Sequence, residues 1–272
     1  MIFYFVLIIS VSLLSATEYY VSPNGSDENS GTIGAPFQTI QHAADLMQSG
    51  DNCYLRSGIY HEAIQINNLN GTSSDLITFT NYQDETVILD GTIPITSSWT
   101  VHDGNIYKTT LTEDIWQLFA DGEEMVMARW PNAGFVDGSI WDQEQNWAHG
   151  DEDSGSNGVM VDDPHDDVNL ANSGIDMTGA IGILNVGSFR TWTRFVNSHG
   201  VGNNSFTYDP VAESAYRTKH HYYFLEKKLE FLDQESEWFF DYGTNELYFW
   251  PPGNADPNSL NIHGKVQSYS FQ

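Results

Sequence analysis

The chain has 272 residues, of which 37 are Asp or Glu and 10 are Lys or Arg, so its formal net charge at pH 7 is -27. This charge argues against nucleic acid and against an anionic membrane surface as partners, because both would repel the protein. Cys53 is the single cysteine, which excludes a disulfide within the chain.

The N-terminus begins with an apolar run at residues 2–11, and the first acidic residue is Glu18. The run is shorter than the roughly 20 residues that a membrane-spanning helix needs. It is typical of a secretory signal peptide, which we place at residues 1–16. We therefore expect a protein that is secreted to the extracellular space, or to the periplasm in a bacterium, without a membrane anchor after cleavage.

Three sequons follow the Asn-x-Ser/Thr pattern, at Asn24, Asn70 and Asn203. In a glycosylating host these asparagines are predicted to be surface glycan acceptors.

The segment that follows predicts one helix and several short strands. Residues 36–47 place apolar side chains on one helical face, with Pro36 in the first turn. Strands are expected at residues 53–56, 63–66, 76–81 and 87–89, each ending at a turn signal. Such spacing fits the rungs of a solenoid and, by periodicity alone, equally a sandwich. Cys53 alternates with Leu55 and is predicted to be a core residue.

Residues 94–258 have a different texture, rich in Trp and Asp. Strand patterns recur at residues 116–120, 124–128, 181–186 and 238–241, whereas the polar stretch 143–172 has little periodicity. We interpret this region as an inserted β-sandwich-like subdomain with the polar stretch as an extended loop.

The opening of the chain resembles the pectate-lyase-like right-handed parallel β-helix family. The resemblance is carried by residues 20–27 (YVSPNGSD), 35–40 (APFQTI), 50–62 (GDNCYLRSGIYHE), 77–79 (ITF) and 87–91 (VILDG). It implies an all-β fold: the start of a right-handed parallel β-helix with an N-terminal capping helix. It says little about chemistry, because lyases, hydrolases, epimerases and adhesins share this opening.

Two later motifs resemble a subgroup of this family that has an inserted β-sandwich and includes glycoside hydrolases. The first motif is residues 117–132 (QLFADGEEMVMARWPN), and the second consists of residues 232–233 (LD) and 237–252 (EWFFDYGTNELYFWPP). The resemblance implies cap and first coils at 17–93, the insertion at 94–258 and a return to the β-helix at 259–272. In that subgroup the active site lies on later coils. We therefore expect an N-terminal fragment that lacks the catalytic coils and is inactive alone.

Carbohydrate-binding candidates were sought among aromatic side chains with polar neighbours, because such faces stack on sugar rings. The candidates are Arg129, Trp130, Trp141, Trp147, Arg190, Trp192 and Arg194. Trp141 and Trp147, in and beside the polar stretch, are the preferred candidates for an exposed platform, whereas Trp238 and Trp250 are predicted to be core. No catalytic residue is assigned.

The remaining acidic and histidine residues predict turns and loops. Asp121 precedes Gly122 between two strands, which indicates a hairpin turn, and Asp233 and Asp241 are interpreted similarly. The acidic groups at 151–153 and 162–167 lack the spacing of a calcium loop, and we interpret them as solvated loop. His149, His165, His199, His220 and His221 form no zinc motif, so no metal site is predicted.

The leading hypothesis is a secreted protein acting on extracellular polysaccharide, as the N-terminal part of a β-helix glycoside hydrolase. The scarcity of basic residues favours a neutral or weakly charged glycan. One alternative is a polysaccharide lyase acting on pectin or alginate, which would use Ca²⁺. The other is a non-catalytic glycan-binding or adhesive surface protein. The sequence assigns no oligomeric state.

Overall fold

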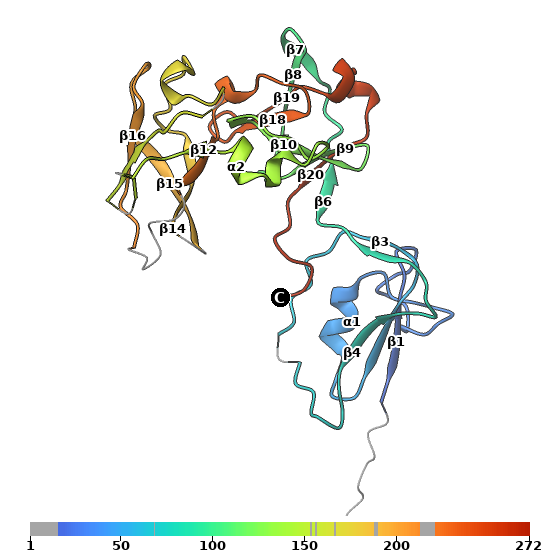
Figure 1. Cartoon of the computed structure of the whole chain (residues 1–272). Helices are drawn as coiled ribbons and strands as arrows, with labels where there is room; N and C mark the ends of the chain where they lie inside the picture. The colour runs from blue at the N-terminus through green and yellow to red at the C-terminus, as the bar shows by residue number, and fades with distance from the viewer. Residues whose placement is uncertain are drawn as a thin grey trace, which may run out of the picture. The chain divides into compact units, whose positions relative to one another are not determined.

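The computed structural model describes residues 16–67, 69–152, 154–155, 157–165, 167–187, 190–212 and 221–272. The chain forms two compact units, unit 1 (Met1–Thr92 with Gln267–Gln272) and unit 2 (Ile93–Val266), whose elements are labelled in Figure 1. Apart from Ala16, the predicted signal peptide lies outside the described residues. Among those residues, no helix combines the length and the apolar character that crossing a membrane requires.

Unit 1 is built from parallel strands in register, as far as its described residues show. β1 (Glu18–Val21), β2 (Asn52–Leu55) and β4 (Thr78–Asn81) form one sheet in that order. β3 (Gly58–Tyr60) pairs with β5 (Val87–Leu89) in a second sheet, and Ile64 forms a parallel bridge with Phe271. One strand per face in each successive coil is the pattern of a parallel β-helix, so the predicted fold is confirmed.

Equivalent residues of neighbouring coils lie on top of one another. Cys53 pairs with Tyr19 on one side and Phe79 on the other, and its side chain is buried. Burial raises the pKa of the Cys53 thiol to about 12, so it behaves as a small core residue, as predicted. On the opposite face of the sheet, the rings of Tyr20 and Tyr54 stack with centroids 5.3 Å apart.

Helix α1 (Ile40–Leu46) begins four residues later than predicted. Phe37 is extended because its backbone N–H donates to Tyr20 O (2.9 Å) and its carbonyl accepts from Ser22 N (2.9 Å). Thr39 is the N-cap and accepts from His42 N (3.2 Å). The predicted strand at 63–66 is reduced to the single bridge at Ile64.

Within the described part of unit 2, the strands form two sheets. The eight-stranded sheet has the order β6-β20-β9-β10-β18-β19-β8-β7. Its strands are β6 (Thr92–Pro94), β7 (Thr100–Asp103), β8 (Ile106–Thr110), β9 (Leu118–Ala120), β10 (Glu123–Met127), β18 (Glu237–Asp241), β19 (Glu246–Phe249) and β20 (Ile262–Lys265).

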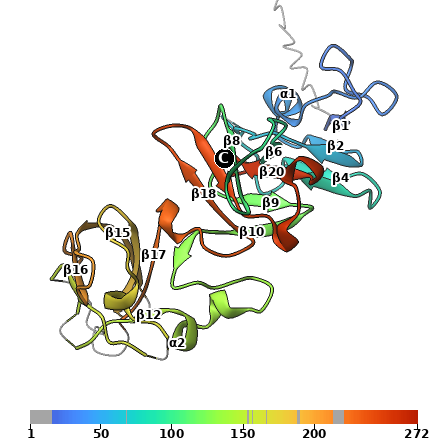
Figure 2. The same ribbon diagram turned by 90° about the horizontal axis from the view of Figure 1, so that it is seen from above.

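The seven-stranded sheet has the order β11-β17-β14-β15-β16-β13, with β12 pairing to β17. Its strands are β11 (Arg129–Trp130), β12 (Ala148–His149), β13 (Val159–Val161), β14 (Ile181–Gly187), β15 (Arg190–Ser198), β16 (Ser205–Tyr208) and β17 (Tyr222–Glu226). Figure 1 and Figure 2 both show β15 and β16 on one side of unit 2 and β8, β9 and β10 on the other.

Each sheet of unit 2 has its own hydrophobic cluster. One cluster centres on Leu184, Phe206 and Tyr223 beside the seven-stranded sheet, and the other on Leu118, Trp238 and Phe249 in the eight-stranded sheet. The inserted region therefore contains two packed cores among its described residues. Trp238 is buried in the second, where the sequence predicted core.

The turns of unit 2 follow the sequence signals in part. Asp121 and Gly122 both have positive φ (51° and 89°) between β9 and β10, which confirms the predicted hairpin turn. The polar stretch 143–172 was expected to be one long loop, and this is wrong. It contains helix α2 (Gln143–Asn146), β12, β13 and the 3-10 helix η2 (Leu170–Asn172); another short 3-10 helix, η1 (Ser139–Trp141), precedes α2.

The segment expected to return to the β-helix, 259–272, is divided between the units. β20 pairs with β9 inside unit 2, and Gln267–Gln272 belongs to unit 1. There Gln267 N donates to Gly91 O (3.1 Å), and Ile64 N donates to Ser270 O (2.8 Å). The segment after the insertion thus adds to the coil that the segment before it began.

Candidate functional site

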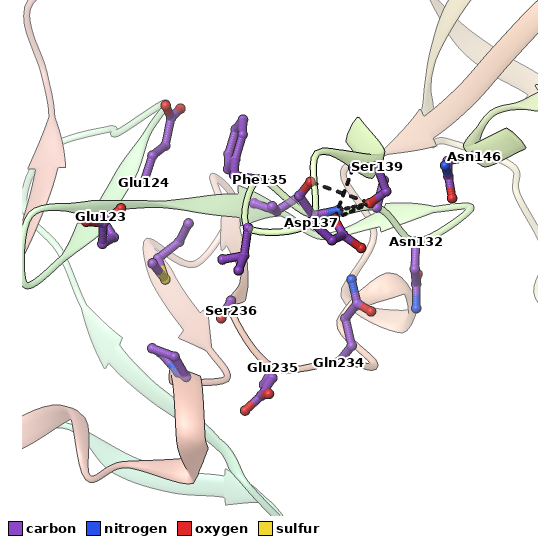
Figure 3. A pocket seen from close by; sticks show the side chains of 16 residues that line it. Glu123, Glu124, Asn132, Phe135, Asp137, Ser139, Asn146, Gln234, Glu235 and Ser236 are labelled. Carbon is purple, nitrogen blue, oxygen red and sulfur yellow. Dashed lines mark hydrogen bonds between the residues drawn. The ribbon is translucent and has the colours of Figure 1, made fainter. Parts of the chain in front are cut away.

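A pocket of about 740 Å³ lies within unit 2 (Figure 3). Its described lining comes from β10, from the loop after β11, from Asn146 of α2, from residues 234–236 before β18, and from Pro252. β10 and β18 are parallel neighbours, with Val126 opposite Glu237, and Val126 N donates to Ser236 O (2.9 Å). This pairing brings segments more than 100 residues apart to the same pocket.

The loop after β11 is held by Ser139. Gly134 N donates to Ser139 Oγ (2.7 Å), and the same hydroxyl donates to Asp137 Oδ1 (2.7 Å), as the dashed lines in Figure 3 show. Ser139 N also donates to Asp137 Oδ1 (3.0 Å). These bonds lower the pKa of Asp137, so an ionised carboxylate forms part of the pocket wall.

Three side-chain amides, those of Asn132, Asn146 and Gln234, gather at one end of the pocket (Figure 3). Two of them donate hydrogen bonds to acidic side chains. Asn132 Nδ2 donates to Asp233 Oδ1 (2.7 Å), and Gln234 Nε2 makes a longer contact with Glu237 Oε1 (3.4 Å). This end of the pocket therefore offers hydrogen-bonding groups of fixed orientation.

Behind the amides lies a group of buried charged residues. Arg129 is 2% exposed and Glu237 is fully buried. Burial lowers the pKa of Arg129 to about 10, raises that of Glu237 to about 8, and raises that of Glu226 to about 7 against the opposing effect of Arg129. Arg129 Nε donates to Pro131 O (2.9 Å), and its guanidinium lies 3.9 Å from the ring centroid of Phe224. Arg129 therefore supports the loop after β11 from the inside.

An apolar rim borders the pocket. Phe135 belongs to the lining, and its ring centroid lies 6.1 Å from that of Trp141, which is 75% exposed. Val136, beside Phe135, is also exposed. Exposed aromatic faces next to fixed polar groups form the kind of surface on which sugar rings stack.

The predicted binding residues are not brought together in one site. Arg129 is buried, and Trp130 is half-buried with its ring 6.1 Å from that of Tyr223. Trp147 is 8% exposed and packs edge-on against Phe224, so the expectation that it forms an exposed platform is wrong. Its ring is part of the core beneath the polar stretch, because that stretch forms short helices and strands and not the extended loop that was expected.

Three other candidates lie on β15. Arg190, Trp192 and Arg194 alternate along the strand and share one of its faces, and none of them lines the pocket. Arg194 Nε donates to Asp209 O (3.3 Å). Of the predicted residues, Arg129 lies behind the described pocket and Trp141 lies beside it, in contact with Phe135. The sequons at Asn24, Asn70 and Asn203 are all exposed, and their glycosylation stays a prediction.

The residues that shape the pocket are not marked as a site by any pattern in the sequence. Asn132 ends the first motif of the subgroup, and Glu237 begins the longer part of the second motif (residues 237–252), so both lie in segments that the sequence singles out. The sequence around these two residues contains no motif that would mark either of them as part of a functional site. Asn146 and Gln234 gave no signal at all, because only the fold brings their segments together.

A second polar cluster surrounds Asp162, which was expected in a solvated loop. That expectation is wrong: Asp162 is buried and accepts from Tyr223 Oη (2.7 Å) and Leu170 N (2.9 Å). Nearby, the rings of His149 and His165 stack with centroids 3.7 Å apart. The described residues contain no group of three or more His, Cys, Asp or Glu side chains arranged to hold a metal ion. Asp153, Asp166 and His220 lie outside the described residues.

The N-terminal region of the chain is similar in sequence to known β-helix proteins. Residues 19–124 match the model of the Pel9A-like, right-handed β-helix region. The chain is 44% identical over 72 residues to the "Uncharacterized protein YwoF" of Bacillus subtilis (strain 168), and 46% identical over 78 residues to "Pectate lyase PEL9" of Emericella nidulans. These segments cover 26% and 28% of this chain, but 15% and 19% of the two relatives.

A solved structure described as "Glycoside hydrolase" has the same fold over most of the chain. Its TM-score is 0.67 at 18% identity, and the alignment covers 94% of this chain and 47% of the other. The chain thus spans less than half the length of these proteins. The family match and the in-register parallel coils of unit 1 agree: the N-terminal region of the chain is similar to the pectate-lyase-like right-handed β-helix family and has its fold.

Proposed function

We propose that this chain is part of a secreted β-helix protein that acts on extracellular polysaccharide, as a glycoside hydrolase for a neutral glycan. The relatives named as a pectate lyase and a glycoside hydrolase support an activity on polysaccharide. The catalytic carboxylates of such a hydrolase are not assigned to any described residue.

The observation that carries the choice of a neutral glycan is the charge of the pocket. Its described lining contains four carboxylates, those of Glu123, Glu124, Asp137 and Glu235, and no Lys or Arg. A polyuronate would bring carboxylates of its own into this lining without a cation to neutralise them. Because β-elimination requires a uronate, an uncharged substrate favours hydrolysis over lyase chemistry.

The experiment is an activity screen, on neutral and acidic polysaccharides, of the whole secreted protein of which this chain is a part. Xylan, arabinan and galactan are compared with polygalacturonate and alginate, with and without Ca²⁺. We expect new reducing ends from at least one neutral glycan and no unsaturated products. Cleavage of acidic glycans alone would refute the proposal.

The pectate lyase relative gives a specific reason to keep the lyase as a second candidate, since its identity to this chain is 46% over the aligned segment. In that case Ca²⁺ would supply the positive charge that the pocket lacks. The signature is ultraviolet absorbance of an unsaturated uronate that appears only with Ca²⁺. Glycan binding without any turnover would instead favour the adhesive or binding protein.

A further inference from the structure

We propose that the amide-lined end of the unit 2 pocket is a binding subsite for one neutral sugar ring, whose hydroxyl groups are recognised by Asn132, Gln234 and Asn146. This inference rests on the proposed function and adds the residues and the chemical class of the bound group. All residues that line the site belong to unit 2.

The orientation of the amides determines what they recognise. The Asn132 amide nitrogen is engaged by Asp233, and that of Gln234 faces Glu237. The carbonyl oxygens of both amides are therefore left as acceptors for a ligand. A sugar hydroxyl can donate to such an oxygen, whereas an ionised carboxylate can only accept.

Glu237 is a positioning residue for this end of the pocket. Its Oε2 accepts from Asp233 N (3.3 Å) while its Oε1 faces the Gln234 amide. Because Glu237 is fully buried and begins β18, it ties the turn before that strand to the eight-stranded sheet. The Asp233 carboxylate that holds Asn132 is part of the same turn.

The charge around the subsite selects against uronates. Asp137 and Glu235 line the same pocket, and the described lining holds no basic side chain. A uronate carboxylate would lie close to these carboxylates, and like charges repel more strongly near a protein surface than in bulk water. A uronate at this position should therefore bind at least about 5-fold more weakly than its neutral counterpart.

The size and shape of the pocket fit a short oligosaccharide. Its volume of about 740 Å³ falls in the range of roughly 300–1,000 Å³ that is typical of small-molecule sites. Phe135 lines the pocket and contacts the exposed ring of Trp141, which extends the apolar surface beyond the amide end. One ring would bind at the amides, and the next would pass over the aromatic rim.

Isothermal titration calorimetry of the full chain tests the inference with four trisaccharide probes: xylotriose, arabinotriose, galactotriose and, with EDTA present, trigalacturonate. We expect at least one neutral probe to bind and trigalacturonate to bind at least about 5-fold more weakly. Equal or tighter binding of trigalacturonate, or no binding of any neutral probe, would overturn the subsite.

Variants locate the binding. We expect the affinity for the neutral probe to fall by about 5- to 10-fold, the equivalent of one lost hydrogen bond, in each of three variants: N132A, Q234A and N146A. N105A, which removes an exposed amide in the β7–β8 turn, is the matched control and should bind as the wild type does. Thermal melts establish that each variant folds, and N146A alters a different element from the other two.

The outcomes separate the subsite from the proposed function. If a neutral polysaccharide is cleaved but the folded variants bind the probe as the wild type does, the subsite is wrong and the hydrolase stands. If the variants lose binding but no glycan is cleaved, the subsite stands and the hydrolase is wrong. Failure to bind and to cleave every glycan would refute both.

Discussion

The two units of the molecule differ in what they bury. In unit 1, the buried polar residue among those described is Asp51, and like side chains stack from coil to coil. Unit 2 buries Arg129, Asp162 and Glu237, and two of these lie directly behind the pocket. Burying charges costs stability unless they are paired and hydrogen-bonded. Unit 1 therefore repeats the same strand pairing from coil to coil, whereas unit 2 buries charged side chains where they orient the walls of the pocket.

The largest expected effect comes from exchanging an arginine in each unit. R129M should lower the free energy of unfolding of unit 2 by about 2 kcal/mol or more, because it leaves the Pro131 carbonyl without its buried, charged donor and removes the cation that favours the ionised form of Glu226. R56M removes a partly exposed ion pair with Glu85 (Nη2 to Oε1, 2.9 Å) and should cost about 1 kcal/mol or less in unit 1. Denaturant unfolding measures both, and equal losses would contradict the contrast between the units.

Titration of Glu237 should make unit 2 less stable in alkali. Its pKa rises from 4.5 to about 8 on folding, so the folded state holds the proton more tightly. This contribution is complete below pH 4.5 and is lost as the pH rises through about 8. In the variant E237Q, the fall in the free energy of unfolding with rising pH should be smaller by more than about 1 kcal/mol. Melting curves between pH 4.5 and 9 check it, with the exposed E235Q as control, which should retain the wild-type decline.

A smaller effect is expected at the rim, on binding and not on stability. W141A should weaken binding of a neutral oligosaccharide by about 5- to 10-fold, because an exposed stacking face is lost. Its free energy of unfolding should stay within about 0.5 kcal/mol of the wild type. F195A removes another exposed aromatic ring of unit 2, on β15, and serves as the control. Equal loss of binding in both variants would contradict specific stacking of the glycan on Trp141.

The smallest change is expected at the sequons. Expressed in a eukaryotic secretory host, N24Q, N70Q and N203Q should each lower the mass of the protein by one glycan. Because all three side chains are exposed, the free energy of unfolding should change by about 0.5 kcal/mol or less. Intact-mass spectrometry checks the occupancy. An unchanged mass in all three variants would show that the sequons are not used.

Much of unit 1 could be predicted from sequence because its signals are local. Alternation put Cys53 and Leu55 in the core, and Asp121-Gly122 marked a hairpin turn in unit 2 for the same reason. The start of α1 was misplaced because long-range backbone bonds to Tyr20 and Ser22 hold Phe37 in an extended conformation. That competition between segments is not visible in the helical pattern.

The pocket could not be predicted because its walls come from distant segments without a periodic pattern. Trp147 looked like Trp141 in sequence, and only the packing of α2 and β17 separates the buried ring from the exposed one. Asp162 sat in an acidic run, yet a tyrosine hydroxyl from β17 makes it a core residue. In both cases the deciding contact comes from β17, some 60 or more residues away along the chain.

The hydrogen bond between Gln267 and Gly91 has a consequence for how this architecture can vary. The chain leaves unit 1 and re-enters it at adjoining positions, so the whole of Ile93–Val266 occupies the place of a single turn within one coil. The entropic cost of closing a loop grows only with the logarithm of its length. A coil of this kind can therefore exchange its inserted module for a short turn, or for another module, while the scaffold beneath keeps its register.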